Sequence, residues 1–69
     1  MSIMDTVFAN TDFVAEAENY ISQDITEYQE ILDDVRECLS EYDATDDEAR
    51  EYATKIMDVI NARKEIEEA

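Results

Sequence analysis

The chain contains neither glycine nor proline, and this absence constrains its fold more than any other feature. The tight turns of β-hairpins depend on residues that tolerate positive φ, chiefly glycine, so a sheet built from hairpins is disfavoured. Helices joined by short polar links need neither residue. We therefore expect an all-α fold, a small helical bundle, and with 69 residues a single domain over residues 1–69.

The clearest helix boundary lies just after residue 44. Thr45 and Glu48 have the spacing of a capping box, in which each side chain accepts a hydrogen bond from the backbone N–H of the other residue. The short link before this helix predicts an antiparallel helical hairpin of residues 26–42 and 46–67. We expect the second helix of the hairpin to bury these side chains: Ala49, Tyr52, Ala53, Ile56, Val59 or Ile60, and Ile66.

The N-terminal part of the chain predicts one or two short helices that cover the hairpin. Ser2 and Asp5 have the spacing of a weak capping box, and Ile3, Met4, Val7 and Phe8 share the apolar face that follows. Asn10 is a residue suited to end this helix in the left-handed conformation, and Thr11 to cap the next.

How the second short helix joins the hairpin is open at this point. A break at residues 22–24 is one interpretation, with Asp24 and Glu27 forming a further capping box. A single unbroken helix over residues 12–42 is the other interpretation.

The lone cysteine, Cys38, falls on the apolar strip between Val35 and Leu39. We therefore expect a buried and unreactive thiol, whose pKa the surrounding acids raise.

The sequence lacks the residues or segments that several classes of protein require. The chain has no histidine for a zinc or di-iron centre, so we expect no metal, no cofactor and no catalytic residue. No apolar run approaches the roughly 18 residues of a membrane span. The N-terminus lacks the basic region of a signal peptide, and one cysteine cannot form an internal disulfide. We expect a cytoplasmic protein that is not an enzyme.

The net charge of −15 arises from twenty acidic and five basic residues. A magnitude of roughly 2–8 is enough for the solubility of a small domain, so the excess is either functional or part of a solvated surface. Such a field favours cationic partners and opposes direct binding to nucleic acid, which needs lysine and arginine on the phosphates.

The acids are concentrated between residues 27 and 51 and follow helical spacing. One row advances by three and four residues and predicts a line of carboxylates opposite the apolar strip: Glu27, Glu30, Asp34, Glu37 and Glu41. A second group beside the hairpin link consists of Asp43, Asp46, Asp47 and Glu51. Tyr42 and Tyr52 flank the link and are candidate anchors for a partner's pocket. Two rows of carboxylates on rigid helices resemble the phosphates of a short DNA duplex.

In size, charge and this acidic row, the chain resembles the small acidic phage and mobile-element proteins that inhibit host defence as DNA mimics, such as anti-CRISPR and anti-restriction proteins. No shared motif accompanies the resemblance. It implies an inhibitor that occupies the nucleic-acid-binding surface of a defence nuclease, a CRISPR effector or a DNA-binding regulator, in the cytoplasm of the host where a phage encodes it.

The alternative is a helical protein–protein interaction module or an antitoxin-like regulator that does not mimic DNA. Its acids would be the solvated face of the helices, and its apolar residues Ile3, Val7 and Phe8 would dock onto a partner helix or a second copy. A homodimer is one form of this alternative.

Overall fold

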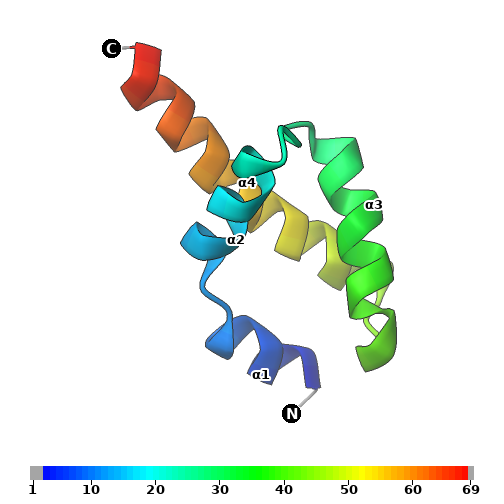
Figure 1. The fold of residues 1–69 in the computed structure, drawn as a ribbon. Helices are drawn as coiled ribbons and strands as arrows, with labels where there is room; N and C mark the ends of the chain where they lie inside the picture. The colour runs from blue at the N-terminus through cyan, green and yellow to red at the C-terminus, as the bar shows by residue number, and fades with distance from the viewer. Residues whose placement is uncertain (1–2, 69) are drawn as a thin grey trace.

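The computed structural model describes residues 3–68, with the side chains of residues 3–66. The chain folds in the order α1 (Ile3–Asn10), α2 (Phe13–Ser22), α3 (Tyr28–Leu39), the 3-10 helix η1 (Ser40–Tyr42) and α4 (Asp46–Glu68). No strand occurs within the described residues, and the expected all-α bundle is confirmed (Figure 1). The capping predicted for Ser2 lies outside the described residues.

The helical hairpin is present, with a shorter first helix than expected. The helices α3 and α4 pack against each other and run in opposite directions, and η1 lies before the turn between them (Figure 1). Ala49 and Ala53 of α4 are buried, and such small side chains let two helices approach closely. They belong to one core of buried apolar side chains, which consists of Met4, Ala17, Tyr20, Ile31, Leu32, Val35, Leu39, Ala49, Ala53, Ile56 and Ile60.

The chain breaks between α2 and α3, so the unbroken helix over residues 12–42 is wrong. Asp24 has a φ of 61°, in the left-handed region. Around it the N–H of Ile25 donates to the carbonyl of Tyr20 at 2.9 Å, and the N–H of Asp24 donates to that of Ile21 at 3.0 Å. These two bonds form a Schellman motif, which in most proteins has glycine in the left-handed position. Aspartate tolerates this conformation and fills the position in a chain without glycine.

Helix capping was predicted correctly at one of three described sites. Thr45 and Glu48 form the expected capping box, with bonds of 3.2 Å and 2.9 Å between backbone N–H groups and side-chain oxygens. Asp24 cannot cap α3 because its left-handed backbone ends α2, and α3 instead begins after Glu27 without a side-chain cap.

At the start of α2 the cap is Asp12 rather than Thr11. The Asp12 carboxylate accepts from the N–H groups of Val14 and Ala15. Thr11 is not the cap because its hydroxyl donates to the carbonyl of Val7 at 2.5 Å. Asn10 does not adopt the left-handed conformation, and its amide closes α1 by donating to the carbonyl of Thr6.

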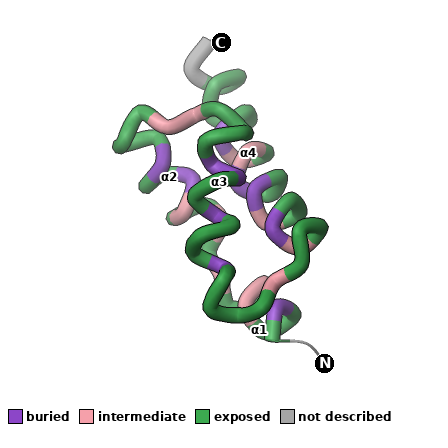
Figure 2. Tube along the Cα trace, turned by 90° about the vertical axis from the view of Figure 1, so that its right-hand side faces the viewer, coloured by how far each residue is buried: buried purple, intermediate pink, exposed green. Residues whose placement is uncertain are grey.

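Two burial predictions for the hairpin are wrong, although Ala49, Ala53, Ile56 and Ile60 are buried as expected. Ile66 is 75% exposed because α4, with 23 residues, extends past the shorter helices that pack on it (Figure 2). Cys38 is exposed, since it lies at the edge of the apolar strip.

Candidate protein-binding surface

The acids predicted to bind a partner are all exposed, and we refer to them together as the acidic surface: Glu27, Glu30, Asp34, Glu37, Glu41, Asp43, Asp46, Asp47 and Glu51. They lie just before α3 and on it, on η1 and the turn after it, and on the first turns of α4. The packing of α3 on α4 places the second group beside only the end of the first row, at Glu37 and Glu41, while Glu27 and Glu30 lie at the opposite end of α3.

The first row of acids does not follow one continuous helix as predicted. Only Glu30, Asp34 and Glu37 lie on α3, where Glu30 and Glu37 are separated by about 10.5 Å of helix rise. Glu27 precedes the helix in an extended conformation, and Glu41 belongs to η1. The row is interrupted because the Schellman motif at Asp24 delays the start of α3 and the 3-10 helix tightens its end.

Asp34 forms the border between the acidic surface and the core. The hydroxyl of Tyr20, a residue that is 5% exposed, donates to the Asp34 carboxylate at 2.5 Å. Burial and this hydrogen bond to Asp34 raise the pKa of Tyr20. Asp34 thus joins α2 to α3 and is less available to a partner than the other acids of α3.

Asp46 is paired within the chain. Its carboxylate lies 2.8 Å from a guanidinium nitrogen of Arg36 on α3 and 3.0 Å from one of Arg50 on α4. Arg36 also lies 3.9 Å from Asp33. The two arginines of this part of the chain are therefore directed at one carboxylate, and the rest of the acidic surface has no ion pair among the described residues.

The two tyrosines predicted as anchors differ in exposure. Tyr42 in η1 is 41% exposed. Tyr52 is half-buried, and its ring lies 5.9 Å from that of Phe8 and 5.0 Å from that of Phe13. Burial raises the pKa of Tyr52. Its ring helps to join α1, α2 and α4, so Tyr42 is the better candidate for an anchor.

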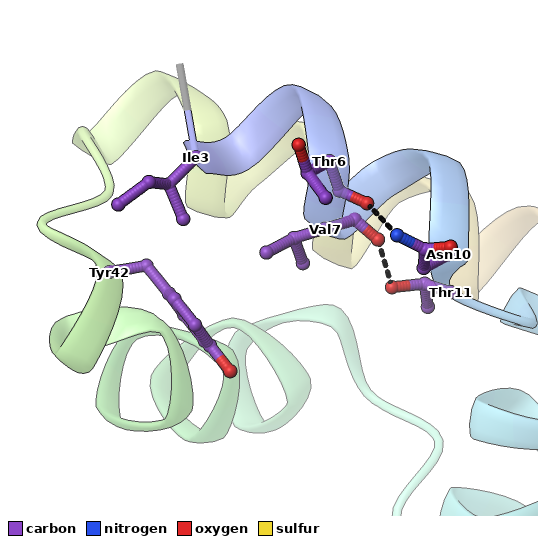
Figure 3. A pocket seen from close by; sticks show the side chains of 6 residues that line it. All are labelled: Ile3, Thr6, Val7, Asn10, Thr11 and Tyr42. Carbon is purple, nitrogen blue, oxygen red and sulfur yellow. Dashed lines mark hydrogen bonds between the residues drawn. The ribbon is translucent and has the colours of Figure 1, made fainter.

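An open groove, which we call the α1–η1 groove, lies beside Tyr42 (Figure 3). It has a volume of about 340 Å³ and is lined by Ile3, Thr6, Val7, Asn10, Thr11 and Tyr42. Figure 3 shows Ile3 and Val7 on α1 and the ring of Tyr42 on the other side. Ile3 is 61% exposed, so the groove presents apolar surface to solvent.

The sequence predicted a binding role for each apolar residue of this groove but did not predict that these residues lie together. Ile3 and Val7 belonged to the alternative interpretation, while Tyr42 was grouped with the acids. Val7 and Tyr42 are separated by more than thirty residues in the sequence, so their proximity could not be predicted from spacing. It depends on how α1 packs on the end of the hairpin. Phe8, the third residue of that apolar set, turns inward to Phe13 and Tyr52.

The remaining candidates give no reactive centre in the described part of the chain. Partial desolvation and the carboxylates around it, Asp34 foremost, raise the pKa of Cys38, as expected. Residues 3–66 contain no group of three or more cysteine, aspartate or glutamate side chains placed to hold a metal ion. Within the described helices, none combines the length and apolar character needed to cross a membrane.

Comparisons with protein-family models, curated proteins and solved structures find no match for this chain. The acidic surface and the α1–η1 groove are therefore the two features of the molecule that bear on its function.

Proposed function

We propose that the chain is an acidic inhibitor that binds and blocks a basic nucleic-acid-binding surface of another protein by mimicking the phosphates of DNA. The observation that carries this proposal is the pattern of ion pairing. Asp46 pairs with both arginines of the region 27–51, whereas exposed carboxylates such as Glu30, Glu37 and Asp47 have no ion pair among the residues that the structure describes.

The carboxylates are also held in place by rigid elements. Glu30 and Glu37 lie on a regular helix whose inner face is buried, and a capping box fixes the start of α4 next to Asp47. The rise from Glu30 to Glu37, about 10.5 Å, matches about three steps of 3.4 Å along one DNA strand. A groove lined by lysine and arginine would therefore meet charges at a spacing close to that of its natural ligand.

The test is a double charge reversal with a matched control. Glu30→Lys with Glu37→Lys changes the acidic surface, whereas Asp58→Lys with Glu65→Lys makes the same change of net charge at the same spacing on the far part of α4. All four residues are exposed, so circular dichroism should show unchanged helicity.

The tagged chain would be used to capture proteins from nuclease-treated bacterial lysate. We expect a nucleic-acid-binding protein that is released by duplex DNA and by about 0.5 M salt, where screening is strong. The Glu30/Glu37 variant should lose this protein and the Asp58/Glu65 variant should keep it. Retention by both variants, or indifference to DNA and salt, would contradict mimicry.

The second candidate function is a helical interaction module, and the exposed apolar lining of the α1–η1 groove favours it. Such a module would bind its partner through Ile3 and Val7 with little dependence on salt. Because Phe8 is engaged with Phe13 and Tyr52, the replacement Phe8→Ala tests packing as well as docking. Ile3→Ser is the cleaner variant for this candidate.

A further inference from the structure

The α1–η1 groove lies next to the acidic surface and presents a different chemistry. Two of its polar side chains bond to the backbone of α1, since the Asn10 amide donates to the Thr6 carbonyl at 2.9 Å and the Thr11 hydroxyl donates to the Val7 carbonyl at 2.5 Å (Figure 3). Besides the Thr6 side chain, the lining offers a partner the apolar surface of Ile3, Val7 and Tyr42. A volume of about 340 Å³ lies at the small end of ligand pockets and suits one large side chain.

The charges around the groove decide what kind of segment can carry that side chain. Glu41 and Asp43 stand on either side of Tyr42, and both side chains are exposed. Among the described residues, none that lines the groove carries a positive charge, and the nearest arginines in sequence, Arg36 and Arg50, are paired with Asp46. A segment that approaches the groove therefore enters a strongly negative field.

A second copy of the chain fits this site poorly. It would bring a net charge of −15 and a further set of carboxylates toward the same acids. Like charges at close range oppose association, whereas lysine and arginine on the approaching segment would favour it.

We infer that the α1–η1 groove receives a large apolar side chain from a lysine- or arginine-rich segment of the partner protein. The inference rests on the proposed function and deepens it. Glu41 and Asp43 belong to the acidic surface and flank Tyr42, so one basic partner can contact both. The carboxylates accelerate encounter, and the buried side chain lengthens the lifetime of the complex.

The first test uses two synthetic peptides and needs no knowledge of the natural target. One is a lysine-rich peptide with a single central phenylalanine, and the other has alanine in its place. Binding to the isotopically labelled chain is followed by nuclear magnetic resonance. We expect the phenylalanine peptide to bind at least about fivefold more tightly and to shift the amide signals of Ile3, Val7 and Tyr42. Equal affinities, or shifts centred away from the groove, would overturn the inference.

Matched variants locate the effect. Tyr42→Ala and Ile3→Ser should abolish the preference for the phenylalanine peptide, while Tyr28→Ala and Ile66→Ser should leave it intact. Tyr28 and Ile66 are about as exposed as their counterparts, at 38% and 75%, but do not line the groove. Should Tyr42→Ala lose its helical signal, Thr6→Tyr narrows the groove from an exposed position and should have the same effect.

Two outcomes separate this inference from the proposed function. If the Glu30/Glu37 charge reversal releases the captured protein and Tyr42→Ala does not, mimicry stands and the groove is not its anchor. If Tyr42→Ala releases the captured protein and the charge reversal does not, the groove binds a partner but mimicry is wrong. A dimer in sedimentation experiments that dissociates in Tyr42→Ala would overturn the inference in favour of a second copy.

Discussion

Replacing Glu37 with glutamine should stabilise the chain while weakening its binding to a basic partner. Asp33 and Asp34 lie four and three residues before Glu37 on α3, and like charges at these spacings each cost about 0.2–0.5 kcal/mol. Glu37 also lies in the last turn of the helix, where a negative charge is disfavoured by about 0.3–1 kcal/mol. The pairing of Asp33 with Arg36 at 3.9 Å offsets part of this repulsion. We expect the free energy of unfolding to rise by about 0.5–1.5 kcal/mol at low salt.

Urea denaturation, followed by circular dichroism at low salt and at about 0.5 M salt, measures this change. Screening should remove most of the stabilisation at high salt. The control is Asp58→Asn on α4, whose only charged neighbour at helical spacing is Lys55. This control loses an attraction rather than a repulsion and should not stabilise the chain. A Glu37→Gln variant that is destabilised, or equally stabilised at both salt concentrations, would refute the electrostatic reasoning.

The same variant should bind the captured partner more weakly, because it lacks one charge of the acidic surface. Stability and binding then change in opposite directions at one residue. This combination distinguishes a carboxylate that serves binding from one that merely solvates a helix, since removal of the latter would leave binding unchanged.

Three further outcomes follow from the fold. Asp24→Gly should raise the free energy of unfolding by about 0.5–1 kcal/mol, because glycine adopts the left-handed conformation without strain. Asp24→Asn removes only the charge, so its free energy of unfolding should rise by less in the same urea titration. Ile60→Ala should cost about 2–4 kcal/mol and Ile66→Ala less than about 0.5 kcal/mol, because the first side chain is buried and the second is 75% exposed. The raised pKa of Tyr20 means that the folded state holds the hydroxyl proton of this residue more tightly than the unfolded state. The contribution of Tyr20 to the free energy of unfolding is therefore complete below about pH 10. It is lost as the pH rises further, by up to about 1.4 kcal/mol per pH unit. Alkaline urea titrations of Tyr20→Phe should show a shallower loss than those of the unaltered chain.

The composition of the chain and one local capping pattern predicted the fold well. The missing glycine and proline and the Thr45–Glu48 capping box were enough for the helical class and the start of α4. The prediction failed where two residues able to cap a helix are adjacent, since it assigned the cap of α2 to Thr11 and the cap is Asp12. Thr11 and Asp12 can both cap α2, and the outcome depends on the Thr11 hydroxyl, which bonds instead to the end of α1.

Features that join distant parts of the chain could not be predicted from helical spacing. Spacing placed Asp46 among the partner-binding acids, but its pairing with Arg36 depends on how α3 packs against α4. The α1–η1 groove depends in the same way on the packing of α1 beside Tyr42. Exposure of Cys38 was missed because a residue at the edge of an apolar strip can face either the core or the solvent.

The positions of the basic residues explain how so acidic a chain can fold and still present uncompensated charge. Arg36 pairs with Asp46 between α3 and α4, and Arg63 pairs with Glu18 between α4 and α2. Lys55 of α4 lies 5.8 Å from the centre of the Phe13 ring on α2. Such exposed contacts contribute only about 0.2–1 kcal/mol each, yet they join helices that carry like charges. A surface selected only for solubility would intersperse lysine and arginine among its acids. Here three of the five cations, Arg36, Lys55 and Arg63, contact a neighbouring helix, and Glu30 and Glu37 have no ion pair among the described residues. This distribution is the one expected of carboxylates that act on a basic partner, as we propose.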